Sequence, residues 1–191
     1  RWQDSHPMVD LQLQDMRNDD LLTAVANGGA DIGLGLEFTV PTAVDTQFVT
    51  EDEIMAVLPT NHRLSKQHEL KWTDLSDEPL VILSRGSTYA MIVSVLEQQG
   101  VGVSHTETLS FTESLYALVR SGLRIGLISR LYTQCHIDDD LVTMPLKAPL
   151  LSRRICLMTR SAESNRRPIV QECWDYLCQN MGSTPAGKTS K

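Results

Sequence analysis

The residues with the clearest potential for binding chemistry form a short polar turn between two apolar segments. The turn consists of Ser84, Arg85, Gly86, Ser87 and Thr88. It follows the apolar run 80–83, which has the length of a buried strand, and precedes a helical pattern that ends at Gly100. The start of a helix presents unpaired N–H groups and a positive dipole end, so the turn is suited to an anion or a hydroxyl, and Arg85 adds a positive charge. The alternative is that Ser87 or Thr88 only caps the helix.

Composition sets limits on the class of protein. The chain has 191 residues, of which 41% are apolar and 21% charged, as in a folded globular chain rather than a disordered one. Its formal net charge of −7 argues against nucleic-acid binding by this segment alone. No apolar run reaches the length of a membrane span. The sequence begins at Arg1 without a methionine, so an upstream segment, including a removed signal, stays open.

No residue cluster has the spacing of a metal or redox site. The four cysteines, which form no C-x-x-C motif, are Cys135, Cys156, Cys173 and Cys178. We expect buried free thiols in a reducing cytosol, with disulfides or zinc as the alternative. His62 and His68 lie in a polar stretch and have no partner at metal-ligand spacing. We therefore predict no metal and no cofactor, and the absence of a catalytic motif predicts that the chain is not an enzyme.

The first third of the chain reads as a strand, a helix and a strand. Residues 9–14 alternate between apolar and polar, a helix begins near Asn18 and ends at Gly28, and 31–36 is a second strand. This order predicts a parallel strand pair with a right-handed crossover. The glycines at positions 33 and 35 leave space for either a neighbouring helix or a ligand.

A second group of alternating strands and helices extends from residue 80 to 128, with strands at 80–83, 101–109 and 125–128. Residues 54–58 are expected to form a strand before this group. A strand at 155–158 and a helix at 165–180 follow the group, and both are suited to complete the strand–helix–strand unit of the first third of the chain. This order predicts two α/β lobes and a chain that crosses between them twice. Ligands of open α/β sheets bind at the carboxyl ends of strands, where the 84–88 turn and residues 36–38 are expected.

The chain resembles the effector-binding domain of LysR-type transcriptional regulators. The matching segments, each weak alone but specific in their joint order, are 29–33 (GADIG), 56–59 (AVLP) followed by 62–64 (HRL), 74–75 (DL) with 78–80 (EPL), 86–87 (GS), 118–126 (LVRSGLRIG) and 141–146 (LVTMPL). The resemblance covers residues 5 to 180. Two positions depart from the family pattern, since Arg124 stands where glycine is usual and Ser129 where proline is common.

The resemblance implies an α/β fold of two Rossmann-like lobes joined by two crossover strands, of the type 2 periplasmic-binding-protein class. The first lobe is expected at 1–58 plus 153–180, with the family's first strand and helix upstream of Arg1, the second lobe at 59–152, and a disordered tail at 181–191. A small effector would bind in the cleft between the lobes of a cytoplasmic protein. The domain would form a homodimer, and the full-length protein a tetramer. DNA would be bound only through an N-terminal domain that this chain lacks.

The expected function is therefore effector sensing, with a solute-binding protein of a transport system as the alternative. The predicted effector contacts are Ser84, Arg85, Gly86, Ser87 and Thr88 on the second lobe, Leu36, Glu37 and Phe38 on the first, and Phe111 and Ile128 nearby. Small polar groups on one wall and apolar ones on the other are suited to a small organic acid. The helix 88–99 and the strand 101–109 are the expected dimer surfaces.

Overall fold

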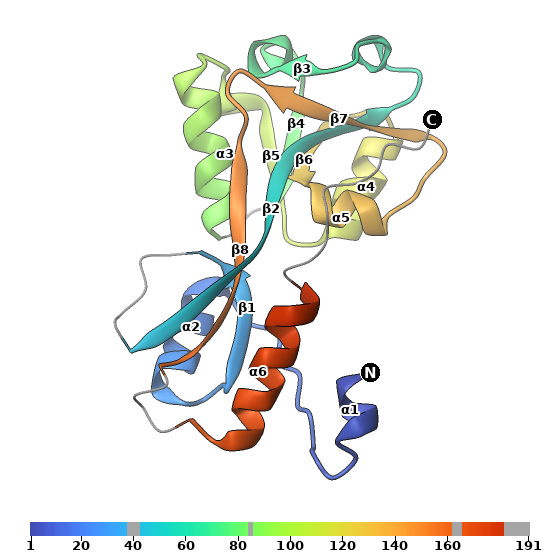
Figure 1. The fold of residues 1–191 in the computed structure, drawn as a ribbon. Helices are drawn as coiled ribbons and strands as arrows, with labels where there is room; N and C mark the ends of the chain where they lie inside the picture. The colour runs from blue at the N-terminus through green and yellow to red at the C-terminus, as the bar shows by residue number, and fades with distance from the viewer. Residues whose placement is uncertain (38–42, 84–85, 162–165, 182–191) are drawn as a thin grey trace. The chain divides into compact units, whose positions relative to one another are not determined.

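The computed structural model describes residues 1–37, 43–83, 86–161 and 166–181, and the chain divides into two compact units (Figure 1). Unit 1 comprises Arg1–Glu51 and Arg153–Lys191, and unit 2 comprises Asp52–Ser152. The chain passes between them within strand β2 (Val44–Pro59) and again at the beginning of strand β8 (Ser152–Arg160). The sequence placed the first boundary after residue 58, because a sequence shows where a strand ends but not where a strand passes from one unit to the next.

Unit 2 contains most of the regular structure. Its strands are part of β2, β3 (Leu70–Lys71), β4 (Leu80–Leu83), β5 (Thr106–Leu109), β6 (Ile125–Ser129) and β7 (Leu141–Lys147). Its α-helices are α3 (Ser87–Gln98), α4 (Thr112–Arg120) and α5 (Arg130–Cys135), and its 3-10 helices are η1 (Arg63–Lys66), η2 (Trp72–Leu75) and η3 (Val103–His105). The strand predicted at 101–109 is thus shorter than expected, since a 3-10 turn replaces its first half.

The sheet of unit 2 has the order β2-β6-β4-β5, and β7 pairs with β2 and β3. β4 is parallel to both β5 and β6, whereas β2 is antiparallel to β6. Successive side chains of a strand face opposite sides of the sheet. Val81 accordingly packs in a cluster with Tyr116 of α4, while Ile82 packs in another cluster with Ile92 of α3. The two helices therefore cover opposite faces of the sheet (Figure 1).

Unit 1 is smaller and has one principal helix–sheet contact. It contains α1 (Trp2–Ser5), α2 (Asn18–Asn27), β1 (Ile32–Leu36), β2 up to Glu51, most of β8, and α6 (Pro168–Met181). A Cβ added at Gly33 would lie 2.7 Å from Leu21 Cδ1, and one added at Gly35 would lie 2.6 Å from Leu21 Cδ2. Of the two roles proposed for these glycines, close packing of a helix is therefore the one that the structure shows.

The prediction of a strand at residues 9–14 is wrong. This segment forms neither helix nor strand, and its Leu13 side chain is 97% exposed. Alternation predicts which side chains would share a face, but a strand also requires a neighbour to complete its hydrogen-bond ladder, and no described strand pairs with this segment. β1 pairs instead with β8 in an antiparallel arrangement, so the predicted parallel pair with its crossover does not form among the described residues.

The remaining predictions for the chain concern its thiols and its hydropathy. All four cysteines are described and free, but only Cys156 is buried, while Cys173 and Cys178 are partly buried and Cys135 is exposed. Within the described ranges, no helix combines the length and the apolar character that crossing a membrane requires. The tail expected at 181–191 lies outside the described residues except for Met181, which ends α6.

Candidate functional site

The carboxyl ends of β4, β5 and β6 meet at one edge of the unit 2 sheet. Leu83 pairs with Leu109 in the register of β4 and β5, and Ile82 pairs with Leu127 in the register of β4 and β6. Helices α3, α4 and α5 begin within a few residues of these strand ends. The unpaired N–H groups at the starts of the two longer helices, α3 and α4, consequently lie at this edge, which is where ligands of parallel α/β sheets bind.

Gly86 is the best-defined part of the predicted binding turn. It caps α3 with φ 95° and ψ 178°, a conformation that only glycine adopts without strain. A Cβ added at this position would have no atom within 4 Å, so the backbone conformation, and not crowding, requires glycine. Ser87 is the first residue of α3 and Thr88 the second, and Thr88 is partly buried. Ser84 and Arg85 lie outside the described residues.

The other two predicted residues of unit 2 have very different environments. Phe111 caps α4 and is 69% exposed, whereas Ile128 of β6 is only 2% exposed and packs in the cluster with Val119 of α4. Phe111 is therefore accessible to a ligand in this structure, while Ile128 contributes to the core. Their contact with an effector stays a prediction.

Asp52 is a buried carboxylate at this edge that the sequence did not single out. It is 1% exposed and accepts a 2.6 Å hydrogen bond from Ser129 Oγ and a 3.1 Å hydrogen bond from the backbone N–H of Leu131. The carboxylate thereby joins β2 to the turn between β6 and α5. In the sequence, Asp52 stands between Glu51 and Glu53 and reads as part of a solvated acidic run, although a strand with one face covered must bury one residue of such a run.

The residues predicted in unit 1 are held by local contacts. Asn18 Oδ1 accepts a 2.8 Å hydrogen bond from the backbone N–H of Leu36, so its side chain binds the end of β1 instead of capping α2. Glu37 Oε2 lies 2.7 Å from Arg154 Nε, and its backbone N–H donates to the Arg154 carbonyl at 2.8 Å. Burial, and secondarily the Glu37 carboxylate, raises the pKa of the Cys156 thiol above its usual range. Phe38 lies outside the described residues.

The imidazoles and carboxylates of the described residues do not gather into a metal site. No group of three or more potential ligands occurs in the part of the chain that the structure describes. His62 instead lies 3.5 Å from Glu78, and Arg63 forms a 2.5 Å ion pair with the same carboxylate. These contacts hold the loop after β2 against the residues that precede β4.

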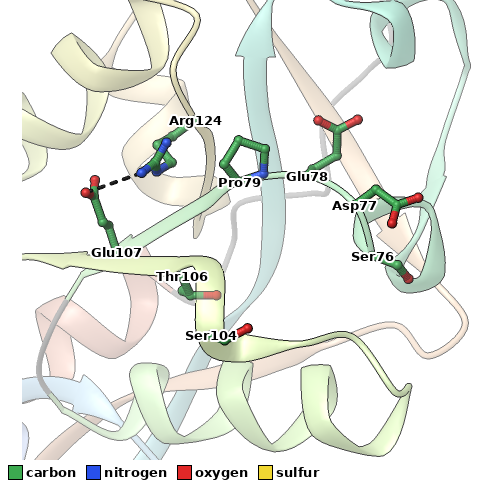
Figure 2. A pocket seen from close by; sticks show the side chains of 8 residues that line it. All are labelled: Ser76, Asp77, Glu78, Pro79, Ser104, Thr106, Glu107 and Arg124. Atoms are coloured by element: carbon green, nitrogen blue, oxygen red, sulfur yellow. Dashed lines mark ion pairs between the residues drawn. The ribbon is translucent and has the colours of Figure 1, made fainter.

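A concave region lies at the opposite, amino-terminal edge of the same three strands. This hollow of about 670 Å³ is formed by residues that precede or begin β4, β5 and β6 (Figure 2). Its lining residues are Ser76, Asp77, Glu78, Pro79, Ser104, Thr106, Glu107 and Arg124. The position of the hollow at the amino ends of strands was not predicted from the sequence, although the unusual arginine at position 124 was a signal.

Comparison with known proteins identifies relatives among transcriptional regulators. The family model of the LysR substrate binding domain matches residues 1–182. A probable nitrogen assimilation transcriptional activator of Synechococcus elongatus is 23% identical over 174 residues, which cover 88% of this chain and 56% of that protein. A probable RuBisCO transcriptional regulator of Porphyra purpurea is 31% identical over 132 residues, 65% of this chain and 41% of that protein. The chain thus spans about half the length of these relatives.

Solved structures agree on the fold. The CcmR regulatory domain of Synechocystis, in complex with 2-PG, matches with a TM-score of 0.81 at 16% identity, covering 97% of this chain and 89% of that one. The reduced OxyR regulatory domain of Pseudomonas aeruginosa matches with a TM-score of 0.78 at 15% identity, covering 95% and 87%. The fold is therefore the α/β fold of LysR regulatory domains, of the type 2 periplasmic-binding-protein class. Since the family model extends over residues 1–182, the chain belongs to the LysR substrate-binding domain family.

Proposed function

We propose that this chain is the effector-sensing domain of a bacterial, cytoplasmic transcriptional regulator of the LysR family. The observation that carries the proposal is the match of residues 1–182 to the substrate binding domain. The relatives above are transcriptional regulators, which favours this function over solute transport and over an enzyme. With a net charge of −7, the domain would leave DNA contacts to another part of the protein.

The effector site would lie at the carboxyl ends of β4, β5 and β6. The turn from Ser84 to Thr88 would bind an anionic group through the N–H groups at the start of α3 and through Arg85. The exposed Phe111 ring would contact the apolar part of the effector. Leu36, Glu37 and Phe38 would contribute from unit 1. A small organic acid has this combination of charge and apolar surface, and the CcmR regulatory domain, of the same fold, was solved with 2-PG.

Effector binding would act by shifting a pre-existing equilibrium between arrangements of the protein. A ligand that binds one arrangement more tightly than another shifts the equilibrium towards the first. The free-energy difference between the arrangements changes by at most the difference in binding free energy. The altered arrangement would then change how domains assemble and how the regulator controls transcription.

Calorimetry with 2-PG and a panel of small organic acids tests this proposal. A true effector should also raise the unfolding midpoint, because it binds only the native state. Arg85→Ala should weaken its binding by about tenfold or more, the effect of losing one charge-assisted hydrogen bond. Arg120→Ala is the matched control, since Arg120 pairs with Asp138 on the surface of the same unit and should leave affinity unchanged. Equal affinities for wild type and Arg85→Ala would remove Arg85 from the site.

We also propose a homodimer in which α3 and the edge strand β5 contact the partner. β5 is the last strand of the sheet order, and Ala90 and Ser94 on α3 are exposed. Ala90→Arg should shift the dimer towards monomer in size-exclusion chromatography with light scattering, because it places a large charge in the contact. Gln134→Arg on the exposed surface of α5 is the control. A dimer unaffected by Ala90→Arg would exclude this surface.

A further inference from the structure

The hollow at the amino-terminal edge of unit 2 contains polar groups that the protein leaves without partners. Among the described residues, Arg124 Nε and Thr106 Oγ1 are buried and make no hydrogen bond. Buried polar atoms are paired in the great majority of cases, and unpaired ones indicate a missing partner or a functional site. Both residues line the same hollow, at the amino-terminal ends of β6 and β5, the strands on either side of β4 (Figure 2).

Arg124 is only loosely held in this hollow. Its Nη2 lies 3.3 Å from Glu107 Oε1, longer than the 2.7–2.9 Å that is typical of a strong N⁺–H···O⁻ bond. Its Nη1 donates to the carbonyl of the adjacent residue Leu123 at 2.8 Å. A small rotation of the guanidinium would present Nε and Nη2 together, which is the geometry for bidentate binding of a carboxylate.

The carboxylates of the hollow provide the complementary charge. Glu78 is already paired with Arg63 and His62. Asp77 is exposed and has no ion pair among the described residues, and Glu107 has only its long contact with Arg124. The unused groups are therefore an arginine N–H edge, a hydroxyl and two carboxylates, and Figure 2 shows Glu107 beside Arg124 and Asp77 at the other end of the hollow.

We propose that this hollow is a second ligand site, which binds a small zwitterion of the amino-acid class. The carboxylate of the ligand would accept hydrogen bonds from Arg124 and Thr106, and its ammonium group would lie near Glu107. A simple anion would face three carboxylates, and a simple cation would leave Arg124 unpaired, so a ligand with both charges fits the lining residues best. The volume of about 670 Å³ lies within the usual range for small-molecule sites.

This site is separate from the proposed effector site. It lies at the amino ends of β4, β5 and β6, and the residues that line it include none of the predicted effector contacts. A ligand there would bind β4 and β6 through the residues that start them, and would therefore stabilise unit 2 independently of the turn at Gly86.

Thermal-shift screening of the intact chain with the common L-amino acids, followed by calorimetry, tests the proposal. At least one amino acid should raise the unfolding midpoint, and the matched amine and the matched carboxylic acid, each lacking one charge, should bind at least about tenfold more weakly. Arg124→Met and Glu107→Gln should each weaken binding by a similar factor, while Arg120→Met and Arg85→Ala should leave it unchanged.

Three results would overturn the proposal. No binding of any common amino acid at millimolar concentration would exclude the ligand class. Equal binding of the matched amine would make the hollow a simple cation site. Unchanged affinity in both Arg124→Met and Glu107→Gln, with melting curves that show folded protein, would place the bound amino acid elsewhere on the chain.

Discussion

Replacing Asp52 by alanine should destabilise the protein at the carboxyl edge of the unit 2 sheet. The Asp52 carboxylate is 1% exposed and accepts hydrogen bonds from the Ser129 hydroxyl and the Leu131 backbone N–H. Ser129 is itself 2% exposed, so water does not readily replace the lost acceptor. The substitution therefore leaves two donors without a partner at the start of α5.

The magnitude follows from the cost of unpaired donors. Leaving one buried donor unsatisfied costs about 1–3 kcal/mol, and removing the buried carboxylate recovers part of its own desolvation cost. We expect Asp52→Ala to lower the free energy of unfolding by about 2–4 kcal/mol, which corresponds to a fall of roughly 5–15 °C in Tm for a chain of this size. Asp52→Asn should cost less, about 1–2 kcal/mol, because the amide oxygen still accepts one of the two hydrogen bonds.

Urea denaturation followed by circular dichroism provides the assay. Asp139→Ala is the matched control, because Asp139 is exposed and no hydrogen bond or ion pair of its side chain occurs among the described residues. The control should unfold within about 0.5 kcal/mol of wild type. An Asp52→Ala variant that also unfolds within about 0.5 kcal/mol of wild type would refute the reasoning, since it would mean that the two donors find other partners.

Two further predictions concern packing and charge in unit 2. Gly126→Ala should lower the free energy of unfolding by about 1–3 kcal/mol in urea denaturation, because the added Cβ would lie 2.8 Å from Leu115 Cδ2. Gly102→Ala is the control and should be nearly neutral, because there is space around Gly102. The hydrogen bond from Arg120 lowers the pKa of the Asp138 carboxyl in the folded protein. A carboxyl with a lowered folded-state pKa stabilises the protein at pH values above its unfolded-state pKa. This stabilisation is lost as the pH falls through the folded-state pKa. Arg120→Met should therefore be less stable than wild type at neutral pH, and the difference should shrink as the pH falls through the lowered pKa of Asp138. A difference that stays constant as the pH is lowered would contradict this.

Local patterns in the sequence predicted most of the elements of unit 2. The strand at 80–83 and the helix after it lie where the apolar spacing placed them, within one residue. A turn, a strand and a helix that are adjacent in the chain form from local preferences and from burial of one face, and both leave a periodic signal. Gly86 is part of that signal, since its positive φ is a local requirement.

Interactions between distant segments account for what the sequence did not predict. Residues 9–14 have the alternating pattern of a strand, but a strand also needs a partner strand for its hydrogen bonds, and no local pattern supplies one. Asp52 pairs with residue 129, 77 positions later, and Arg124 meets Glu107 across two strands. Each of these side chains is ordinary in its own segment and gains its role only when the sheet brings the segments together.

Helix α3 connects the proposed effector site to the proposed dimer contact. Its first residues follow Gly86 in the proposed effector turn, and its exposed residues Ala90 and Ser94 face the proposed dimer contact. On its other side, Ile92 and Leu96 are at most 2% exposed and pack in the core of unit 2. A closely packed core does not deform smoothly, so the helix would transmit a change at its first turn by moving as a rigid body. If both proposals hold, an effector that repositions the turn at Gly86 also repositions the dimer surface two turns further along the same helix.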